Sequence, residues 1–583
     1  MGRKKRRREG KQLEALSAPR FREAAFTGPT VRRLVLFGVA AFAFLVYVQT
    51  LAFSFTYLDD NTLVLDEAAF LSDIAHAVDA FRRDVFGSGS PSYRPVMTLS
   101  LMLDAQMGGT SPRAYHVANV VWHALATCVV AAVLLRLRYS PRAAGVGALL
   151  FTSHPALVPA VAWIPGRNDS LLTLFALLAF LALIVWSEGK RWPVFILHQG
   201  AFAAALFTKE SAFVLPLLWL LYRRRVASQR PRRVEDALLA GGWLLVAAGW
   251  AIARRAALAG AAPVAIGPDV LLHAARAFVE LVGAMLVPAG LAVYPVFSFG
   301  RTLIGGAAVV LLVALLGRPR DLARPGRLLF GAAWLVLTLV PSLLLKQQSV
   351  DFDYLHHRLY LPMFGLVVIV LEFAARRGVS FEERRTARVG MAIVGGFALL
   401  AVVASRDYRD GLAFWTSAVR SAPRASDARY NLGVVHESRG ERPAARVRYE
   451  EAIRLNPADP VLSPKYYVNL GRLVEDEGQL AQAAESYAHA IALAPGFALA
   501  YSNLGAVEFK QGDLDAAERH FERAIALQPS LWLAHYNLCA MRFQQGRLED
   551  ARRSCEESLR QGGDDRVSAG LARVREAMLE HQR

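Results

Sequence analysis

Two adjacent carboxylates, Asp59 and Asp60, follow directly on the first long apolar segment of the chain, which ends at Phe55. A charge at the end of such a helix is costly unless it faces a polar cavity. A carboxylate in this place could act as general base toward an acceptor hydroxyl. It could also bind a metal ion, or it could be ordinary loop solvation. The dipeptide alone leaves these three interpretations open.

Further polar residues occur in short islands between or within the apolar segments. Arginine in such an island suits a phosphate, because its guanidinium can bind two phosphate oxygens at once. The convergence of acids and arginines near one membrane surface suggests a lipid-phosphate substrate that is cleaved there. The island residues are Tyr93, Arg94, His116, Asn119, His123, His154, Arg167, Asp169, Lys209, Glu210, His357, Arg358 and Tyr360.

Three of these residues share one helix face. His116, Asn119 and His123 are spaced i, i+3 and i+7, so they line up along one side of a helix. A metal site is one interpretation, but the face carries no carboxylate. Polar packing between neighbouring helices is the interpretation that we favour.

Long apolar helices must position these groups. Charge-free runs recur from Leu34 to about Ser405 and then stop. A bilayer crossing needs about 20 apolar residues, and continuous apolar blocks differ from the alternating strands of a β-barrel. The pattern therefore excludes a wholly soluble protein and predicts a polytopic helical membrane domain. Eleven spans are expected near 33–55, 115–137, 143–163, 169–187, 192–208, 211–222, 237–253, 302–316, 328–346, 359–375 and 388–405.

The net charge of +18, from 67 basic and 49 acidic residues, sets the orientation of these spans. The basic residues cluster in short segments between apolar runs, which is typical of cytoplasmic loops and argues against nucleic-acid binding. All the basic loops fall on the same side of the membrane only if the ambiguous region 270–299 does not cross it. We therefore expect this region to be re-entrant or to lie at the outer surface. We then expect the N-terminus inside, and the loop 56–114 and the C-terminal third outside. Arg254 and Arg255 count against this scheme, because they fall on the outer side.

The C-terminal third is a repeat array. Leu470-Gly471, Leu504-Gly505 and Leu538-Cys539 are 34 residues apart, and Leu432-Gly433 comes 38 residues before the first of them. Small residues, an aromatic and a closing proline recur at fixed offsets after each pair. This is the tetratricopeptide pattern of stacked helix hairpins. Such arrays bind peptides or proteins along a concave face. Trp415 fits the second helix of a preceding half unit, whose first helix would be the last span, so we expect a stiff junction there.

The last repeat departs from the pattern at two cysteines. Cys539 replaces the glycine and Cys555 the aromatic, so the two side chains would face each other across one hairpin. Outside the cytoplasm they could form a disulfide. We favour the alternative of two buried thiols.

The ordered set of motifs resembles a known family. The set comprises Asp59-Asp60, Tyr93-Arg94-Pro95, His116-x-x-Asn119-x-x-x-His123, His154-Pro155, Ala160-Val161-Ala162-Trp163, Gly166-Arg167-x-Asp169, Lys209-Glu210 and Tyr360-Leu361-Pro362, followed by the repeats. Over about 30–580 it resembles the transmembrane and tetratricopeptide-repeat O-mannosyltransferases (the TMTC family) and their bacterial relatives. This chain departs from the family pattern at Pro159, where relatives often carry Glu, and at His357, where an acid commonly precedes the arginine.

The resemblance implies a GT-C fold with its active site on the non-cytoplasmic face. It implies an inverting transfer of a sugar, mannose in the family, from a polyprenyl-phosphate donor to a Ser or Thr hydroxyl of a protein. Asp59 or Asp60 would be the base, without a metal or other cofactor. Donor phosphate would be held by Arg94, Arg167, Lys209 and Arg358. The remaining island residues would line the substrate site: Tyr93, His116, Asn119, His123, His154, Asp169, Glu210, His357 and Tyr360.

The expected chain is thus all-α, with a GT-C-type membrane domain followed by a tetratricopeptide-repeat α-solenoid. We expect a basic cytoplasmic tail at 1–32, the transferase domain at 33–405 and the repeats at 406–583. The expected partners are the polyprenyl-phosphate sugar, a protein acceptor on the repeats and the lipid bilayer of a bacterial inner membrane or the endoplasmic reticulum. Two alternatives remain open: a non-enzymatic membrane-anchored scaffold for an envelope complex, and a ligase or polymerase of surface polysaccharide.

Overall fold

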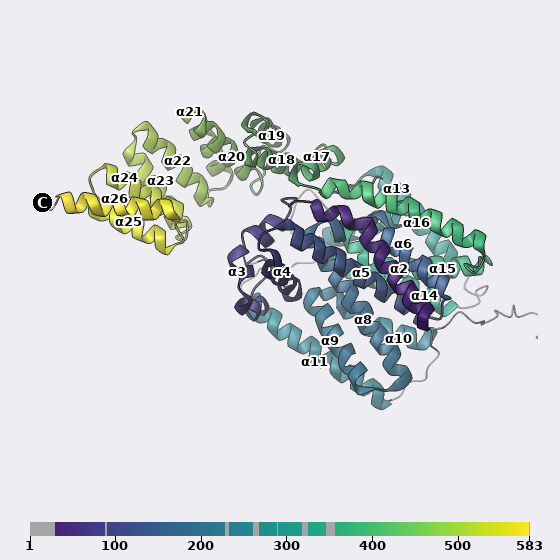
Figure 1. The fold of residues 1–583 in the computed structure, drawn as a ribbon. Helices are drawn as coiled ribbons and strands as arrows, with labels where there is room; N and C mark the ends of the chain where they lie inside the picture. Colours follow the sequence, from purple (N-terminus) through teal and green to yellow (C-terminus); the bar gives the residue numbers. More distant parts are fainter. Residues whose placement is uncertain are drawn as a thin grey trace, which may run out of the picture.

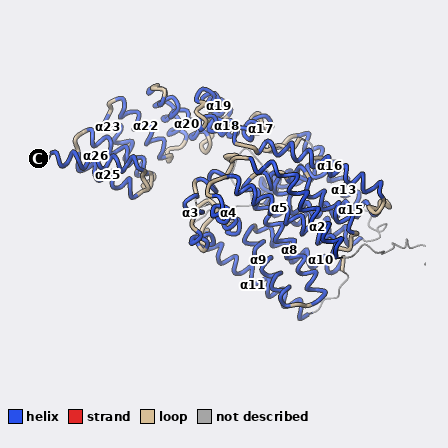
Figure 2. Tube along the Cα trace, viewed as in Figure 1, coloured by secondary structure: helices blue, strands red, loops and turns tan. Residues whose placement is uncertain are grey.

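The computed structural model describes residues 29–87, 90–227, 233–259, 267–288, 290–316, 325–344 and 356–581. Within these ranges the chain is helical and has no strand (Figure 2). A bundle of long helices forms one part, and a curved row of short helix pairs extends from it (Figure 1). The predicted all-α fold, with apolar helices followed by repeats, is confirmed. Most of the predicted basic tail 1–32 lies outside the described residues.

Seven described helices are long and apolar enough to cross a membrane. They contain α2 (Pro29–Tyr47), α5 (Pro112–Arg136), α8 (Arg167–Gly189), α11 (Arg233–Ala257), α14 (Pro325–Leu344), α15 (Tyr360–Arg376) and α16 (Arg384–Ser405). The helices α5, α8, α14 and α15 form the interior of the bundle, and α2 is mostly exposed. Similarly, α11 and α16 expose most of their apolar surface, as helices that face lipid do.

The predicted count of eleven full-length spans differs from the structure in four places. The segment 143–163 is bent by 54° between α6 (Pro141–Ser153) and the helical turns 155–162, because Pro155 and Pro159 interrupt the helix. Two spans are shorter helices, α9 (Trp192–Thr208) and α13 (Phe299–Leu316). At 211–222 the structure has a 3-10 turn (Glu210–Val214) and the 11-residue α10 (Leu215–Arg225). That helix is about 16 Å long and too short to cross a bilayer by itself.

Ion pairs gather the basic helix ends on one side of the bundle. They connect the C-terminal ends of α5, α8, α10 and α15, the N-terminal ends of α6, α11 and α14, and the α15–α16 connection. The pairs are Arg136–Glu188 (2.6 Å), Lys190–Glu235 (2.5 Å), Arg142–Glu382 (3.0 Å), Arg327–Glu372 (3.6 Å) and Arg223–Asp236. The helix ends that the charge pattern predicts on the cytoplasmic side of the membrane are therefore in contact with one another. The island residues come from the opposite ends of the helices.

The loop after α2 forms a small layer of its own. Its helices α3 (Ala68–Ser72) and α4 (Pro95–Gly108) enclose an apolar cluster around Leu63, Leu71 and Leu101 that is separate from the main core. This layer covers the end of the bundle from which α5 begins. It therefore lies over the side where the island residues are found.

The region 270–299 is a helix followed by an extended segment. α12 (Pro268–Leu286) carries Asp269, Arg276 and Glu280, and it is not among the candidate spans of the described chain. The following segment reaches the repeats, where the ring of Tyr294 lies 6.2 Å from that of Trp415. That 270–299 is re-entrant or lies at the outer surface stays a prediction.

The repeats are helix hairpins, as predicted. The array consists of α17 (Gly411–Ser421), α18 (Ser426–Ser438), α19 (Arg442–Leu455), α20 (Ser463–Asp476), α21 (Leu480–Leu493), α22 (Ala498–Gln511), α23 (Leu514–Leu527), α24 (Trp532–Gln544), α25 (Leu548–Arg560) and α26 (Asp565–His581). A β-carbon on Gly471 would lie 2.7 Å from the Tyr487 ring, so glycine is needed where the aromatic packs between paired helices. Gly433 with Tyr449 and Gly505 with Phe521 repeat this packing.

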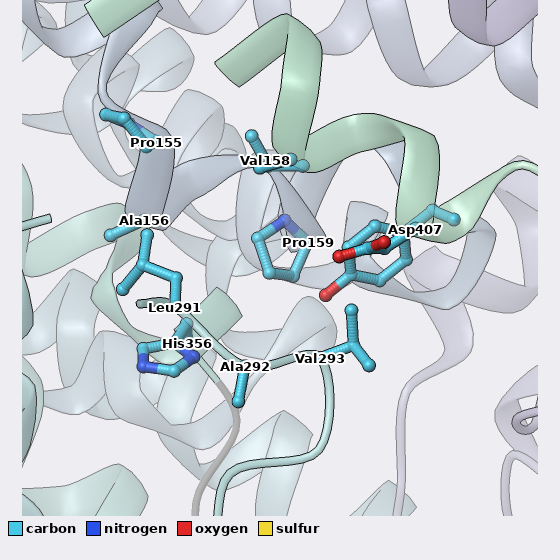
Figure 3. Close-up of a pocket in the computed structure, with 11 residues that line it drawn as sticks. Pro155, Ala156, Val158, Pro159, Leu291, Ala292, Val293, His356 and Asp407 are labelled. Carbon is cyan, nitrogen blue, oxygen red and sulfur yellow. The ribbon is translucent and has the colours of Figure 1, made fainter. Parts of the chain in front are cut away.

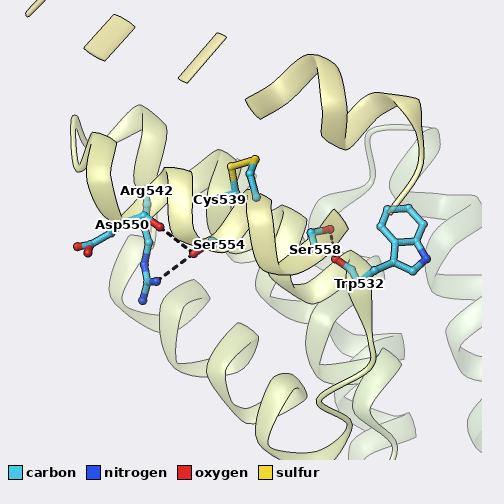
Figure 4. The surroundings of a disulfide bond; sticks show 7 residues. Trp532, Cys539, Arg542, Asp550, Ser554 and Ser558 are labelled. Atoms are coloured by element: carbon cyan, nitrogen blue, oxygen red, sulfur yellow. Dashed lines mark hydrogen bonds between the residues drawn. A yellow bond between two sulfur atoms is a disulfide. The ribbon is translucent and has the colours of Figure 1, made fainter. Parts of the chain in front are cut away.

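The last hairpin is closed by a disulfide between Cys539 and Cys555 (Figure 4). Our preferred interpretation of two free buried thiols was wrong. The two cysteines occupy the glycine and aromatic positions of the earlier repeats, which are in direct contact. This contact brings their α-carbons to 5.3 Å, within the range that a disulfide spans.

No loose linker separates the array from the membrane helices. α16 ends at Ser405 and passes through one 3-10 turn (Arg406–Tyr408) into α17. The Gln49 side chain donates to the Ser405 hydroxyl at 3.2 Å, and Trp415 is fully buried. The junction is packed, which agrees with the stiff connection predicted from the half repeat.

Candidate active site

The carboxylate of Asp60 holds the turn that follows the first span. Its Oδ2 accepts hydrogen bonds from the Thr56 backbone N–H at 2.6 Å and from the Thr56 hydroxyl at 2.9 Å. Its Oδ1 accepts from the Asn61 N–H at 3.1 Å, and the residue has no exposed surface. Burial raises the pKa of Asp60 to about 7; the hydrogen bonds from Thr56 oppose this, and the charge of Asp59 adds to it. Asp60 is therefore occupied with its own loop.

Asp59 is presented differently. Its side chain is exposed, and its backbone is left-handed with φ 65°. The backbone carbonyl just before it, that of Leu58, accepts a 2.8 Å hydrogen bond from the indole N–H of Trp163. Although exposed, the carboxylate is densely surrounded by protein, which raises its pKa to about 6, while the positive charge of Arg94 lowers it. Of the two adjacent acids, Asp59 is the one that can meet a substrate.

Arg94 is the cation that acts on this carboxylate, and two further cations interact with Arg94. Arg94, at the N-terminus of α4, interacts electrostatically with Asp59 and also with Lys209 and Arg358. Lys209 follows α9, and its Nζ donates to both oxygens of Asp169 at 2.9 and 3.1 Å. Arg358 lies in the turn before α15 and interacts with Asp169 and Glu210. Because like charges held so close repel each other, an anion between them would be stabilised.

His357 completes this cluster. Its Nε2 lies 3.6 Å from Oδ2 of Asp169, and its ring centroid lies 5.5 Å from that of Trp163. Trp163 thus contacts both the Asp59 loop and the turn that carries Arg358. The sequence shows this tryptophan only as part of a motif, because its hydrogen bond to Leu58 joins residues that are 105 positions apart in the chain.

Arg167 is engaged elsewhere. It has no exposed surface, and its guanidinium pairs with the buried Asp104 and donates to the Tyr115 carbonyl at 2.8 Å. These bonds fasten the start of α8 to α4 and α5. Asp104 was not predicted from the sequence, since a single acid in an apolar helix carries no signal of its partner. In the structure Arg167 joins helices and is not presented to the other cations.

The predicted polar face of α5 packs against its neighbours. The Asn119 side chain donates to the carbonyls of Val161 and Trp163, each at 3.0 Å. His123 Nδ1 is hydrogen bonded to the Tyr360 hydroxyl at 2.5 Å, and the ring of His116 lies edge-on to Phe53. Polar packing is therefore the observed role of this face. Asn119 acts on the site indirectly, because the turn that it holds contains Trp163.

Two further predicted residues stabilise loops around the site. The Tyr93 hydroxyl donates to the Phe81 carbonyl at 3.0 Å, inside the layer over the bundle. His154 Nε2 is bonded to the Met285 carbonyl at 3.0 Å, which ties the bend after α6 to the end of α12. Both residues are buried. Tyr93 directly precedes Arg94, and Met285 lies in the last turn of α12, shortly before the segment 290–298.

A small pocket lies beside the site, under the start of the repeats (Figure 3). It is lined by the bend at Pro155–Pro159, the segment Leu291–Val293, His356 and the turn with Asp407 and Tyr408. The pocket does not include Asp59 or the three cations. Among the described residues, no three His, Cys, Asp or Glu side chains gather as a metal site.

Comparisons with known proteins identify the repeats directly. Models described as tetratricopeptide repeat match residues 398–460, 464–497, 498–531 and 532–557. The first match begins inside α16, so the last span serves as a helix of the first repeat. A solved structure of MamA resembles the chain with a TM-score of 0.23 at 20% identity, covering 26% of this chain and 86% of that one.

Similar curated proteins are named protein O-mannosyl-transferases. The chain is 36% identical over 195 residues to Tmtc1 of Drosophila melanogaster, covering 31% of this chain and 22% of that protein. It is 36% identical over 154 residues to TMTC2 of Homo sapiens, covering 25% and 18%. The matches span about a fifth of the relatives' length. The resemblance that the motifs predicted is confirmed.

Proposed function

We propose that this protein is a membrane glycosyltransferase of GT-C type that transfers mannose from a polyprenyl-phosphate donor to a hydroxyl of a protein acceptor. The observation that carries the proposal is the arrangement of Asp59 with Arg94, Lys209 and Arg358. Asp59 is an exposed carboxylate beside Arg94, and Arg94 in turn interacts with Lys209 and Arg358. This arrangement suits a hydroxyl acceptor and a phosphate donor that meet in one place.

Asp59 would be the general base. The acceptor oxygen attacks the anomeric carbon of the sugar, and its proton passes to the Asp59 carboxylate. The bond between that carbon and the phosphate oxygen breaks, and polyprenyl phosphate leaves with the bonding electrons. A single displacement of this kind inverts the anomeric centre. Phosphate is a good leaving group, so no general acid is required.

Arg94, Arg358 and Lys209 would hold the donor phosphate. Arg94 and Arg358 can each offer two N–H donors to phosphate oxygens. Lys209 is paired with Asp169, and it would add positive charge to the phosphate site without contacting the phosphate through all its donors. Arg167, which is bonded to Asp104, would support the site through α8 instead of binding the donor.

We place this chemistry on the non-cytoplasmic face, within the domain 33–405, with the repeats 406–583 presenting the acceptor there. Two observations support this. The island residues lie at the helix ends opposite the basic ends, and basic ends face the cytoplasm as a rule. The Cys539–Cys555 disulfide in the array would persist in an oxidising compartment such as the periplasm or the endoplasmic reticulum lumen.

The test is transfer by the purified full-length protein in detergent or nanodiscs. It is supplied with labelled polyprenyl-phosphate-mannose and a mixture of envelope proteins, and the acceptor band is detected. Asp59→Asn should lower the rate at least about a hundredfold, the range over which a general base acts. Asp79→Asn is the matched control, because Asp79 is exposed and paired with Arg82 on the layer over the bundle.

Undiminished transfer by Asp59→Asn would overturn the assignment of the base. Failure of the wild type with mannose and with glucose, galactose and N-acetylglucosamine donors would favour the scaffold. Transfer to a glycan instead of a protein would favour the polysaccharide ligase. A reporter that needs the periplasm, fused after Arg583, tests the orientation separately.

A further inference from the structure

The loop that carries Asp59 is bonded directly to the start of the repeat array. The Ser54 backbone N–H donates to the Arg409 carbonyl at 2.7 Å. Arg409 lies between the 3-10 turn after α16 and the first residue of α17, and we name residues 406–411 the array root. A backbone hydrogen bond at this place joins the exit of the first span to the exit of the last one.

Gly411 of the array root is in close contact with the same loop. A β-carbon at this glycine would lie 2.9 Å from the ring of Tyr57, 3.1 Å from Val435 and 3.4 Å from the Thr56 carbonyl. The first of these distances is too short for any side chain, so a substitution must move Tyr57 or α17. The array root thus packs against the two residues that precede Leu58 and Asp59.

A second contact reaches the other wall of the site. The Tyr294 hydroxyl donates to the carboxylate of Asp427 at the start of α18, and its ring packs beside Trp415 of α17. Tyr294 belongs to the segment 290–298, whose Ala292 carbonyl is hydrogen bonded to His356. His356 directly precedes His357 and Arg358. The first helices of the array therefore touch both the Asp59 loop and the segment behind Arg358.

The loop at Asp59 depends on outside contacts for its shape. Tyr57 and Asp59 both have left-handed backbones, with φ values of 59° and 65°. Such conformations are unfavourable for residues with a side chain, and they persist where the surroundings hold them. The described contacts that hold them come from Asp60, from Trp163 and from the array root.

We propose that the array root is a positioning element of the active site, in which Gly411 and the Arg409 carbonyl hold the Asp59 loop in its reactive shape. The repeats would then do more than bind the acceptor, because their docking fixes the base. A movement of the array, such as one caused by a bound acceptor, would then shift the Asp59 loop through this contact. This inference rests on the proposed transferase function.

The test compares Gly411→Ala with wild type in the full-length protein. The acceptor is a short Ser/Thr peptide at saturating concentration, so that acceptor affinity does not limit the rate. We expect kcat to fall at least about tenfold while the KM for the polyprenyl-phosphate sugar stays within about twofold. The acid limb of the pH–rate profile should also move toward the ordinary carboxylate value near 4, because a displaced Asp59 loses its dense surroundings.

Gly496→Ala is the matched control, since a β-carbon there meets no atom within 4 Å. A second variant, Tyr294→Phe, removes the hydroxyl that donates to Asp427 without adding volume. It should lower kcat about two- to fivefold while the protein stays folded at the assay temperature. Thermal unfolding of Gly411→Ala and Tyr294→Phe is compared with that of wild type. This comparison separates an effect on the position of Asp59 from a loss of the fold.

A folded, active Gly411→Ala protein with wild-type kcat and pH profile would overturn the inference and leave the transferase function intact. Equal loss of kcat in Gly411→Ala and Gly496→Ala would overturn it as well, because the effect would then be a general one of the array. Absence of transfer by the wild type would refute the proposed function itself. These results are distinct, so each failure can be assigned.

Discussion

Thr56 donates to one carboxylate oxygen of Asp60 through both its backbone N–H and its hydroxyl. The bonds between Thr56 and Asp60 give the two neighbouring acids different roles. Asp60 closes the turn from inside, and Asp59 is left exposed beside Arg94. The first prediction tests this division. Thr56→Val keeps the shape and the backbone bond but removes the hydroxyl, and it should destabilise the protein by about 1.5–3 kcal/mol, as expected for a hydrogen bond to a charged group.

Thermal unfolding and transfer assays measure the effect of Thr56→Val. Activity should fall less than in Asp59→Asn, because the base remains in the chain. Thr50→Val is the comparison, since the Thr50 hydroxyl bonds only to the nearby Tyr47 carbonyl. If Asp60→Asn and Asp59→Asn changed stability and kcat by the same amounts, the two acids would not have separate roles.

The second prediction concerns pH. The pKa of Asp59 is raised to about 6 by its surroundings, and a base must be ionised to accept a proton. The rate should therefore rise about tenfold per pH unit below 6 and level off above it. Arg94 lowers the pKa of Asp59, so Arg94→Gln should move this acid limb to higher pH and also raise the donor KM. Initial rates from pH 4.5 to 8.5 measure both. An acid limb that stays in place in Arg94→Gln would show that Arg94 does not act on the base.

The third prediction concerns the buried Asp104–Arg167 pair. Asp104→Asn leaves the guanidinium buried without its counter-ion, and such a loss destabilises a protein by about 3–5 kcal/mol. The double variant Asp104→Leu with Arg167→Met should recover much of the stability, because no charge is then buried. Thermal unfolding measures this, and the donor KM of the double variant reports on substrate contact. A large rise in donor KM with restored stability would indicate that Arg167 binds the donor phosphate after all.

The fourth prediction concerns packing in the repeats. Gly471→Ala places a β-carbon 2.7 Å from the Tyr487 ring, and overpacking of this kind is unfavourable by about 1–3 kcal/mol. Gly496→Ala serves again as control. Limited proteolysis of the full chain should cut the array of Gly471→Ala sooner than that of wild type. Equal resistance of the two variants would mean that the hairpin adjusts without loss.

The fifth prediction concerns the disulfide of the last repeat. Cys539 and Cys555 are 16 residues apart, and closing a loop of this size stabilises a fold by about 3 kcal/mol. Reduction, or the pair Cys539→Ser with Cys555→Ser, should loosen α24–α26 and leave transfer to a short peptide unchanged, because the disulfide lies far along the chain from Asp59. Hydrogen exchange over 532–581 measures the loosening. Free thiols titrated in protein purified without reductant would contradict the disulfide and remove one support for the outer location.

Much of the fold follows from local pattern. The apolar runs from Leu34 to Ser405 and the 34-residue period after Arg406 are periodic over long stretches, and such signals survive without knowledge of contacts. The helix count was the weaker part. The prolines at 155 and 159 divide the apolar segment 143–163, which hydropathy reads as continuous. The segment after Lys209 forms a helix of only 11 residues, which is too short to be a span.

The candidate site was predicted as a set of residues but not as an arrangement. The islands from Arg94 to Arg358 come from different helix ends, and only packing decides which side chains meet. Asp104 shows the limit, because an acid inside an apolar helix does not reveal that its partner is an arginine 63 positions away. The disulfide shows the same limit, as the sequence placed Cys539 and Cys555 face to face without deciding whether they bond.

The sequence by itself determined that this chain is a helical membrane protein with a tetratricopeptide array, and it supplied the acids and cations of the candidate site. These features depend on composition and periodicity, which are properties of the chain alone. Only the tertiary structure decided that Asp60 is bound to Thr56 while Asp59 is exposed, that Arg167 is paired with Asp104, and that Gly411 packs on the Asp59 loop. Those distinctions depend on hydrogen bonds, charges and close contacts between residues that are distant in sequence or that differ only in the direction of a side chain, and folding alone fixes them.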